Sequence, residues 1–137
     1  AIGKGRMMRT PADATIAILS FGSRLDACLR ACDMLEAEGI AVTLADARFA
    51  KPLDVPLLLE LVKAHSHLIT IEEGVCGGFA AQVMQALLTH APDRIHTLHT
   101  LMLPDYFQSH NDMEVMYAQV GMDAPSIAQK IRTLNQP

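Results

Sequence analysis

The sequence predicts a three-layer α/β domain in which helices cover both faces of a mainly parallel sheet. Apolar runs of strand length alternate along the chain with segments whose apolar residues recur at helical spacing. The runs are nearly continuous rather than alternating, which is typical of strands buried on both faces of a parallel sheet. Strand–helix–strand units close by right-handed crossovers, so we expect helices on both sides of the sheet.

The first half of the chain contains two predicted strands, each followed by a helix. Residues 14–21 form the first apolar run, and Ser23 is the expected N-cap of the helix that follows it. Gly39 suits the left-handed position after that helix, and residues 40–46 form the next strand. Asp54 then precedes a second helical pattern as its expected N-cap.

The second half repeats the alternation and ends in two short helices. The third strand is expected at residues 67–71, and a glycine-rich turn at residues 74–78 leads into a helix. Residues 95–103 form the fourth expected strand. A pattern that resembles a capping box begins at Asn111, and Asp123 is the expected N-cap of the last helix.

Composition excludes several classes of protein. The chain has 137 residues, of which 50% are apolar, so it can bury a core without disulfides or metal. A net charge of -4 without a Lys/Arg block argues against nucleic acid as a partner, and no apolar run approaches the ~18 residues of a membrane span. The three cysteines form no C-x-x-C pair, which suits a reducing compartment. The sequence favours one soluble, cytoplasmic domain over residues 1–137.

Polar residues gather where the expected strands end, and ligands and partners of such sheets bind at this edge. Arg48, Glu72, Glu73 and Asp105 lie there. Neighbouring residues on a strand point to opposite faces, so the two glutamates are not expected to flank one substrate. A salt bridge or a cap is the expected role of either glutamate, with Arg48 as the natural partner.

Other catalytic or ligand-binding patterns are missing from the sequence. The glycine-rich turn at residues 74–78 matches neither the dinucleotide-binding nor the P-loop spacing. The six histidines include no pair with the i, i+4 spacing of a helical metal site. Asp105 and His110 could not be joined to a serine nucleophile, because no G-x-S-x-G elbow is present. From the residues alone, no catalytic, cofactor or metal site is expected.

Several segments, in order, resemble the C-terminal domain of 1-deoxy-D-xylulose-5-phosphate synthases. These segments are Gly3-Lys4-Gly5, Ile16 to Gly22, Asp46 to Asp54, Ile69 to Gly74, Gly77-Gly78-Phe79, Leu103-Pro104-Asp105 and Gly121 to Ala124. The resemblance runs from about Gly3 to Ile131. The stretch from Arg48 to Asp54 separates this family from the related pyruvate dehydrogenase E1 β-subunits and transketolases.

The resemblance implies membership in a thiamine-diphosphate enzyme. Such synthases condense pyruvate with glyceraldehyde 3-phosphate, release carbon dioxide and begin non-mevalonate isoprenoid biosynthesis. They are homodimers of three-domain chains, whose cofactor and magnesium are held by a Gly-Asp-Gly motif and a glutamate outside these residues. The implied fold is a five-stranded mixed sheet in which a short strand near Arg6 to Arg9 runs antiparallel. This segment alone is therefore expected to bind no cofactor and to be inactive.

We interpret the chain as an interface domain that contacts the N-terminal catalytic domains and a second copy. The interface candidates are Arg48, Glu72, Glu73, Asp105 and His110. His110 lies in a Gln-Ser-His stretch where the family more usually has Ile-Asp-His. Two alternatives remain: the C-terminal domain of an E1 β-subunit that needs a separate α-subunit, and a stand-alone flavodoxin-like module that binds a small anion.

Overall fold

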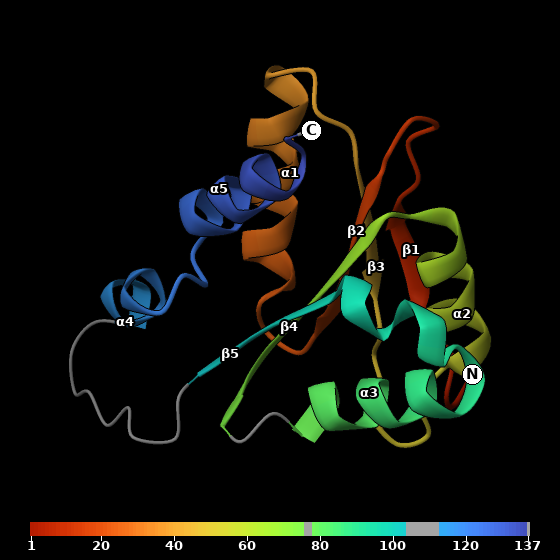
Figure 1. Ribbon diagram of the computed structural model, residues 1–137. Helices are drawn as coiled ribbons and strands as arrows, with labels where there is room; N and C mark the ends of the chain where they lie inside the picture. The colour runs from red at the N-terminus through yellow and green to blue at the C-terminus, as the bar shows by residue number, and fades with distance from the viewer. Residues whose placement is uncertain (76–77, 104–112, 137) are drawn as a thin grey trace.

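The computed structural model describes residues 1–75, 78–103 and 113–136. Its elements are, in chain order, β1 (Arg6–Arg9), β2 (Ile16–Phe21), α1 (Leu25–Ala37), β3 (Val42–Asp46), α2 (Val55–Ala64), β4 (His67–Val75), α3 (Gly78–His90), a 3-10 turn (Pro92–Thr97), β5 (Leu98–Leu103), α4 (Met113–Gln119) and α5 (Ala124–Leu134). Figure 1 shows the strands between two groups of helices, with α1 and α5 on one side and α2 and α3 on the other.

The strands form one five-stranded sheet in the order β1-β3-β2-β4-β5. β1 runs antiparallel to β3, and the other neighbours are parallel. The mixed sheet and its antiparallel strand at Arg6–Arg9 are thereby confirmed. β2 lies at the centre, where Ile18 is in register with Leu44 on one side and Ile69 on the other.

Alternate residues of the central strands enter two separate cores. Ile16, Ile18 and Ile69 face α1 and α5, whereas Ala17 and Leu19 face α2 and α3. The near-continuous apolar runs follow from burial on both faces, as the sequence predicts. The first core also contains the two cysteines of α1, which confirms their expected role as small core residues.

Three of the expected helix boundaries are confirmed and one is wrong. Asp54 accepts a hydrogen bond from Leu57 N, and Asp123 accepts one from Ser126 N, so both cap their helices. Gly39 has φ +80° directly after α1. The N-cap of α1 is Arg24 rather than Ser23, and it makes no side-chain capping bond.

The third and fourth strands differ from the sequence prediction. β4 continues to Val75, because its pairing with β5 resumes at Leu103 after an irregularity. The fourth strand begins at Leu98 rather than residue 95, since a 3-10 turn precedes it. The Arg94 side chain donates to the carbonyls of Val62 and His65, which ties this turn to the end of α2.

Two histidines meet at the amino edge of the sheet, which the sequence did not indicate. His67 Nδ1 lies 3.2 Å from His99 Nε2, because β4 and β5 are adjacent and both rings point toward the α5 side. Burial, the charge of Lys130 on α5, and His67 lower the pKa of His99. The folded chain therefore disfavours the protonated form of His99.

This lowered pKa makes the stability of the chain depend on pH. The unfolded chain binds the His99 proton at a higher pH than the folded chain, so the unfolding free energy should decrease as pH falls through about 6.5. Urea denaturation at several pH values measures the effect, and His99→Gln should flatten the profile while His96→Gln, at an exposed histidine, should not. A profile that is the same in His99→Gln and the unchanged chain would contradict the expectation.

Candidate functional site

At the carboxyl edge of the sheet, the chain leaves β2 toward one face and leaves β4 toward the other. β2 and β4 are paired side by side, yet the first leads to α1 and the second to α3 across the sheet. Such a divergence is the topological switch point at which α/β sheets form their crevices. The polar residues at the ends of β2 and β4 are therefore the candidate functional site.

Glu72 is buried at this edge, with 4% of its surface exposed, and it caps α3. Its Oε1 accepts from Phe79 N at 3.0 Å and its Oε2 from Ala80 N at 2.7 Å. The carboxylate satisfies two free N–H groups at the positive end of the helix. Phe79 also stacks on Phe21 with ring centroids 4.9 Å apart. Glu72 has the capping role that the sequence favoured for one of the two glutamates.

Glu73 points to the other face and is exposed. The buried Tyr117 of α4 donates its hydroxyl hydrogen to Glu73 Oε2 at 2.6 Å. Hydrogen bonds from Ser23 and Tyr117 lower the pKa of the Glu73 carboxyl, so it is ionised at neutral pH. Burial and the bond to Glu73 raise the pKa of Tyr117, which keeps the phenol protonated. At neutral pH the pair is therefore a carboxylate that accepts a hydrogen bond from a neutral phenol.

Arg24 completes this cluster on the α1 side of the sheet. Its guanidinium carbon lies 3.7 Å from the centroid of the Tyr117 ring, and its Nη2 donates to Met122 O at 3.1 Å. The side chain is 5% exposed, and within the described residues its Nε has no hydrogen-bond partner. Arg24 and Tyr117 therefore join the start of α1 to α4 and to the segment before α5.

Neither Arg24 nor Tyr117 was among the residues singled out in the sequence. Arg24 could have been found, because it follows the end of the first strand directly. Tyr117 gives no such signal: it is 93 positions from Arg24 along the chain and comes next to it through tertiary packing alone.

Arg48 lies at the end of β3 and is exposed. The expected ion pair of Arg48 with Glu72 or Glu73 is wrong, because β2 separates β3 from β4 and the described ion pairs do not include Arg48. Its guanidinium carbon instead lies 5.5 Å from the Phe49 ring centroid. Its backbone has φ +65°, and its N–H donates to Asp46 Oδ1 at 3.1 Å.

Asp105, His110 and the capping pattern at Asn111 lie outside the described residues, so their roles stay predictions. Within residues 1–75, 78–103 and 113–136, no group of three or more His, Cys, Asp or Glu side chains could hold a metal ion. Burial raises the pKa of the Cys28 thiol to about 12 and of the Cys32 thiol to about 11, so neither is a nucleophile at neutral pH. The described part of the edge offers binding and positioning groups rather than a catalytic constellation.

Comparison with known proteins assigns the family. Residues 3–127 match the family described as "Transketolase, C-terminal domain". The chain belongs to this family. A split-gene transketolase structure described as an inactive β4 tetramer superposes with a TM-score of 0.79 at 26% sequence identity. That superposition covers 96% of this chain and 41% of the other.

Two further transketolases share the fold of this transketolase C-terminal domain. The enzyme from Campylobacter jejuni subsp. jejuni NCTC 11168 has a TM-score of 0.62 at 13% identity, and a mutant enzyme from Pichia stipitis has 0.66 at 12%. Each superposition covers 96% of this chain and 18% of the other. The domain therefore spans less than half the length of each of these three structures. None of its described helices combines the length and hydropathy needed to cross a bilayer.

Proposed function

We propose that the chain is the C-terminal domain of a 1-deoxy-D-xylulose-5-phosphate synthase and serves as an interface domain. The observation that carries the proposal is a contact between two of the segments that resemble 1-deoxy-D-xylulose-5-phosphate synthases. Gly5 N donates to Asp54 Oδ2 at 2.9 Å, which joins Gly3-Lys4-Gly5 to the stretch from Asp46 to Asp54. A Cβ on Gly5 would lie 2.6 Å from Leu57 Cδ2 and 2.9 Å from Asp46 O, so this contact requires glycine.

The exposed groups at the carboxyl edge support the interface role. Arg48 carries a charge that no described carboxylate neutralises, and the ionised Glu73 is exposed at the same edge on the far side of β2. The proposed partners are the catalytic domains of the parent chain and a second copy. The split-gene transketolase described as a β4 tetramer supports self-association, because its chain includes a similar domain and assembles with itself.

The residues present do not fit the thiamine diphosphate and magnesium that the family uses. The described residues contain no cluster of three potential metal ligands, and the sequence contains no Gly-Asp-Gly. We therefore assign both groups to domains outside this chain and derive no step of the reaction here. In the proposed enzyme, which we place in the cytoplasm, those domains condense pyruvate with glyceraldehyde 3-phosphate and release carbon dioxide.

The test is the reaction of the full parent protein. Pyruvate and glyceraldehyde 3-phosphate, supplied with thiamine diphosphate and magnesium, should give 1-deoxy-D-xylulose 5-phosphate and one carbon dioxide per turnover. Reductive acylation of a lipoyl group that required a separate α-subunit would instead identify an E1 β-subunit. Transfer of a two-carbon unit between sugar phosphates would identify a transketolase, and either result would overturn the proposed substrate pair.

Arg48 and Glu73 give a prediction specific to the interface. In this chain alone, Arg48→Ala should change the unfolding free energy by less than about 0.5 kcal/mol, because the side chain is exposed. Glu73→Gln should lower it by about 1 kcal/mol, because glutamine keeps an acceptor for the Tyr117 hydroxyl and loses only the charge. In the parent enzyme, each substitution should reduce dimer affinity or kcat/KM by about tenfold or more. The reason is that each would remove one partner of a buried charge pair formed across the interface with another domain. Analytical ultracentrifugation and steady-state kinetics measure these effects.

Arg30→Ala and Glu60→Gln are the matched controls, since both residues are exposed on helices. They should leave assembly and kcat/KM unchanged. If Arg48→Ala and Glu73→Gln were equally silent in the parent enzyme, this edge would be ordinary surface.

A further inference from the structure

A cavity of about 430 Å³ opens at the amino edge of the sheet, at the opposite end from the carboxyl-edge cluster. It lies between the turn after β1, the α1 helix and the connection from α1 to β3. Its lining residues are Arg9, Thr10, Pro11, Cys32, Glu36, Gly39, Ile40, Ala41 and Val42. The volume falls within the roughly 300 to 1,000 Å³ that small-molecule sites occupy.

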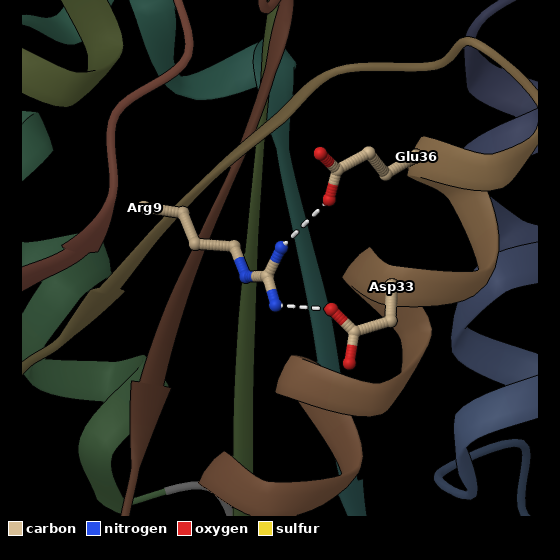
Figure 2. Close-up of polar contacts among 3 residues, drawn as sticks. All are labelled: Arg9, Asp33 and Glu36. Carbon is tan, nitrogen blue, oxygen red and sulfur yellow. Dashed lines mark hydrogen bonds and ion pairs between the residues drawn. The ribbon is translucent and has the colours of Figure 1, made fainter.

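The charged side chains in and beside the mouth of this cavity are negative overall: Arg9 and Glu36 line it, and Asp33 lies next to Arg9 outside the lining. Arg9 reaches from β1 toward α1, where its Nη1 donates to Glu36 Oε2 at 3.2 Å and its Nη2 donates to Asp33 Oδ1 (Figure 2). One guanidinium therefore faces two carboxylates, which leaves a net charge of about -1. Both terminal nitrogens of Arg9 are engaged, and its Nε is buried out of reach of a ligand.

The end of α1 adds to this negative potential. α1 ends at Ala37, two residues before the cavity-lining Gly39, and its last turn contains no basic side chain. The carboxyl end of a helix carries about half a negative charge on its free carbonyls. Part of that charge is offset, because Leu35 O and Glu36 O accept hydrogen bonds from residues 38–40 and Arg132 of α5 pairs with Glu38. The helix end therefore adds only modestly to the potential that Asp33 and Glu36 create.

Apart from Thr10 and the backbone at Gly39, the remaining walls are apolar. Pro11, Ile40, Ala41 and Val42 line the cavity, together with the Cys32 thiol. Because burial raises the pKa of Cys32 to about 11, this thiol is uncharged at neutral pH. The cavity thus joins an apolar interior to an anionic rim.

We propose that this cavity binds a small organic cation, namely a protonated amine carried on an apolar or aromatic body. The ammonium group is bound by Glu36, whose carboxylate holds Arg9 through one oxygen and is otherwise largely exposed, with 75% of the side chain accessible. The apolar body is buried against Pro11, Ile40 and Val42. A carboxylate or phosphate ligand is disfavoured, because Glu36 and Asp33 repel it and already occupy the accessible ends of Arg9.

Three probes with the same phenylethyl body and different charge test the proposal. Phenethylamine is the cation, 2-phenylethanol the neutral analogue and 3-phenylpropionate the anion. In a ¹H–¹⁵N titration of the chain, phenethylamine should give saturable shifts at the amides of Thr10, Glu36 and Ala41, with Kd about 1 mM for a probe of this size. The alcohol should bind at least several-fold more weakly, and the anion should give no saturable shift.

Glu36→Gln should weaken phenethylamine binding about tenfold, which corresponds to the loss of a charge-assisted hydrogen bond. Glu60→Gln is the matched control, because Glu60 lines a second cavity of about 230 Å³ beside the same turn. Equal binding of the three probes, the absence of saturable shifts, or unchanged affinity in Glu36→Gln would each overturn the proposal. The experiment requires no catalysis, so its outcome is independent of the reaction proposed for the parent enzyme.

Discussion

Glu72→Ala is expected to lower the unfolding free energy of the chain by about 3 kcal/mol. The carboxylate is buried and accepts from the N–H groups of Phe79 and Ala80. Bonds to a charged acceptor are stronger than neutral ones, and the substitution leaves both donors without a partner in the folded chain. The first turn of α3 should therefore fray, and the stacking of Phe79 on Phe21 should weaken with it.

Thermal and urea denaturation measure this loss, which should appear as a decrease in Tm of about 10 °C for a domain of this size. Glu73→Gln is the control at the neighbouring position, because it keeps an oxygen for the Tyr117 hydroxyl and leaves α3 untouched. Its Tm should stay within about 4 °C of the unchanged chain, because only the charge of a carboxylate that accepts from Tyr117 is lost. Equal effects at Glu72 and Glu73 would show that the helix cap is not what stabilises this edge.

The second large effect concerns catalysis. The chain alone, given pyruvate, glyceraldehyde 3-phosphate, thiamine diphosphate and magnesium, is expected to release no carbon dioxide above the uncatalysed background. The reason is chemical, since the described residues offer no metal-ligand cluster and both cysteines of α1 stay protonated. Coupled carbon dioxide detection, with the parent enzyme as the positive control, measures the difference.

Binding is tested separately from turnover. A ligand that binds only the folded chain raises its stability by about 2.7 kcal/mol at a hundredfold excess over Kd. We expect thiamine diphosphate with magnesium not to bind this chain, so the Tm should stay unchanged. A saturable increase of several degrees would place a cofactor site within these residues. Measurable carboligation by the chain alone would contradict the assignment of the reaction to other domains.

Local patterns in the sequence were sufficient for the class of fold. Apolar runs long enough for buried strands and caps such as Asp54 and Asp123 depend on neighbours within a few residues, so sequence patterns indicate them directly. The sequence predicted the ends of helices and strands less well than the class of fold. β5 starts late because Arg94 anchors the preceding turn to α2, a contact across 29 or more positions. The antiparallel strand β1 was predicted only from the family resemblance, because its four residues are too few to show a strand pattern.

In the candidate site too, local sequence patterns predicted some features and distant contacts decided the others. The alternation of side chains along a strand separated Glu72 from Glu73, and the structure places the first under α3 and the second beside Tyr117. Arg48 was paired wrongly because strand order does not follow chain order: β2 lies between β3 and β4. Asp105 and His110 lie outside the described residues and stay predictions.

The sequence by itself determined the α/β class, both confirmed N-caps and the absence of a nucleotide-binding glycine pattern, because each depends on residues close together in the chain. Tertiary structure alone decided that Arg24 lies on the ring of Tyr117 and that Arg9 bridges Asp33 and Glu36. These contacts join elements whose separation in the chain is large and whose proximity depends on sheet order and helix packing. Side-chain periodicity reports which face of an element is buried, but it does not report which distant element covers that face.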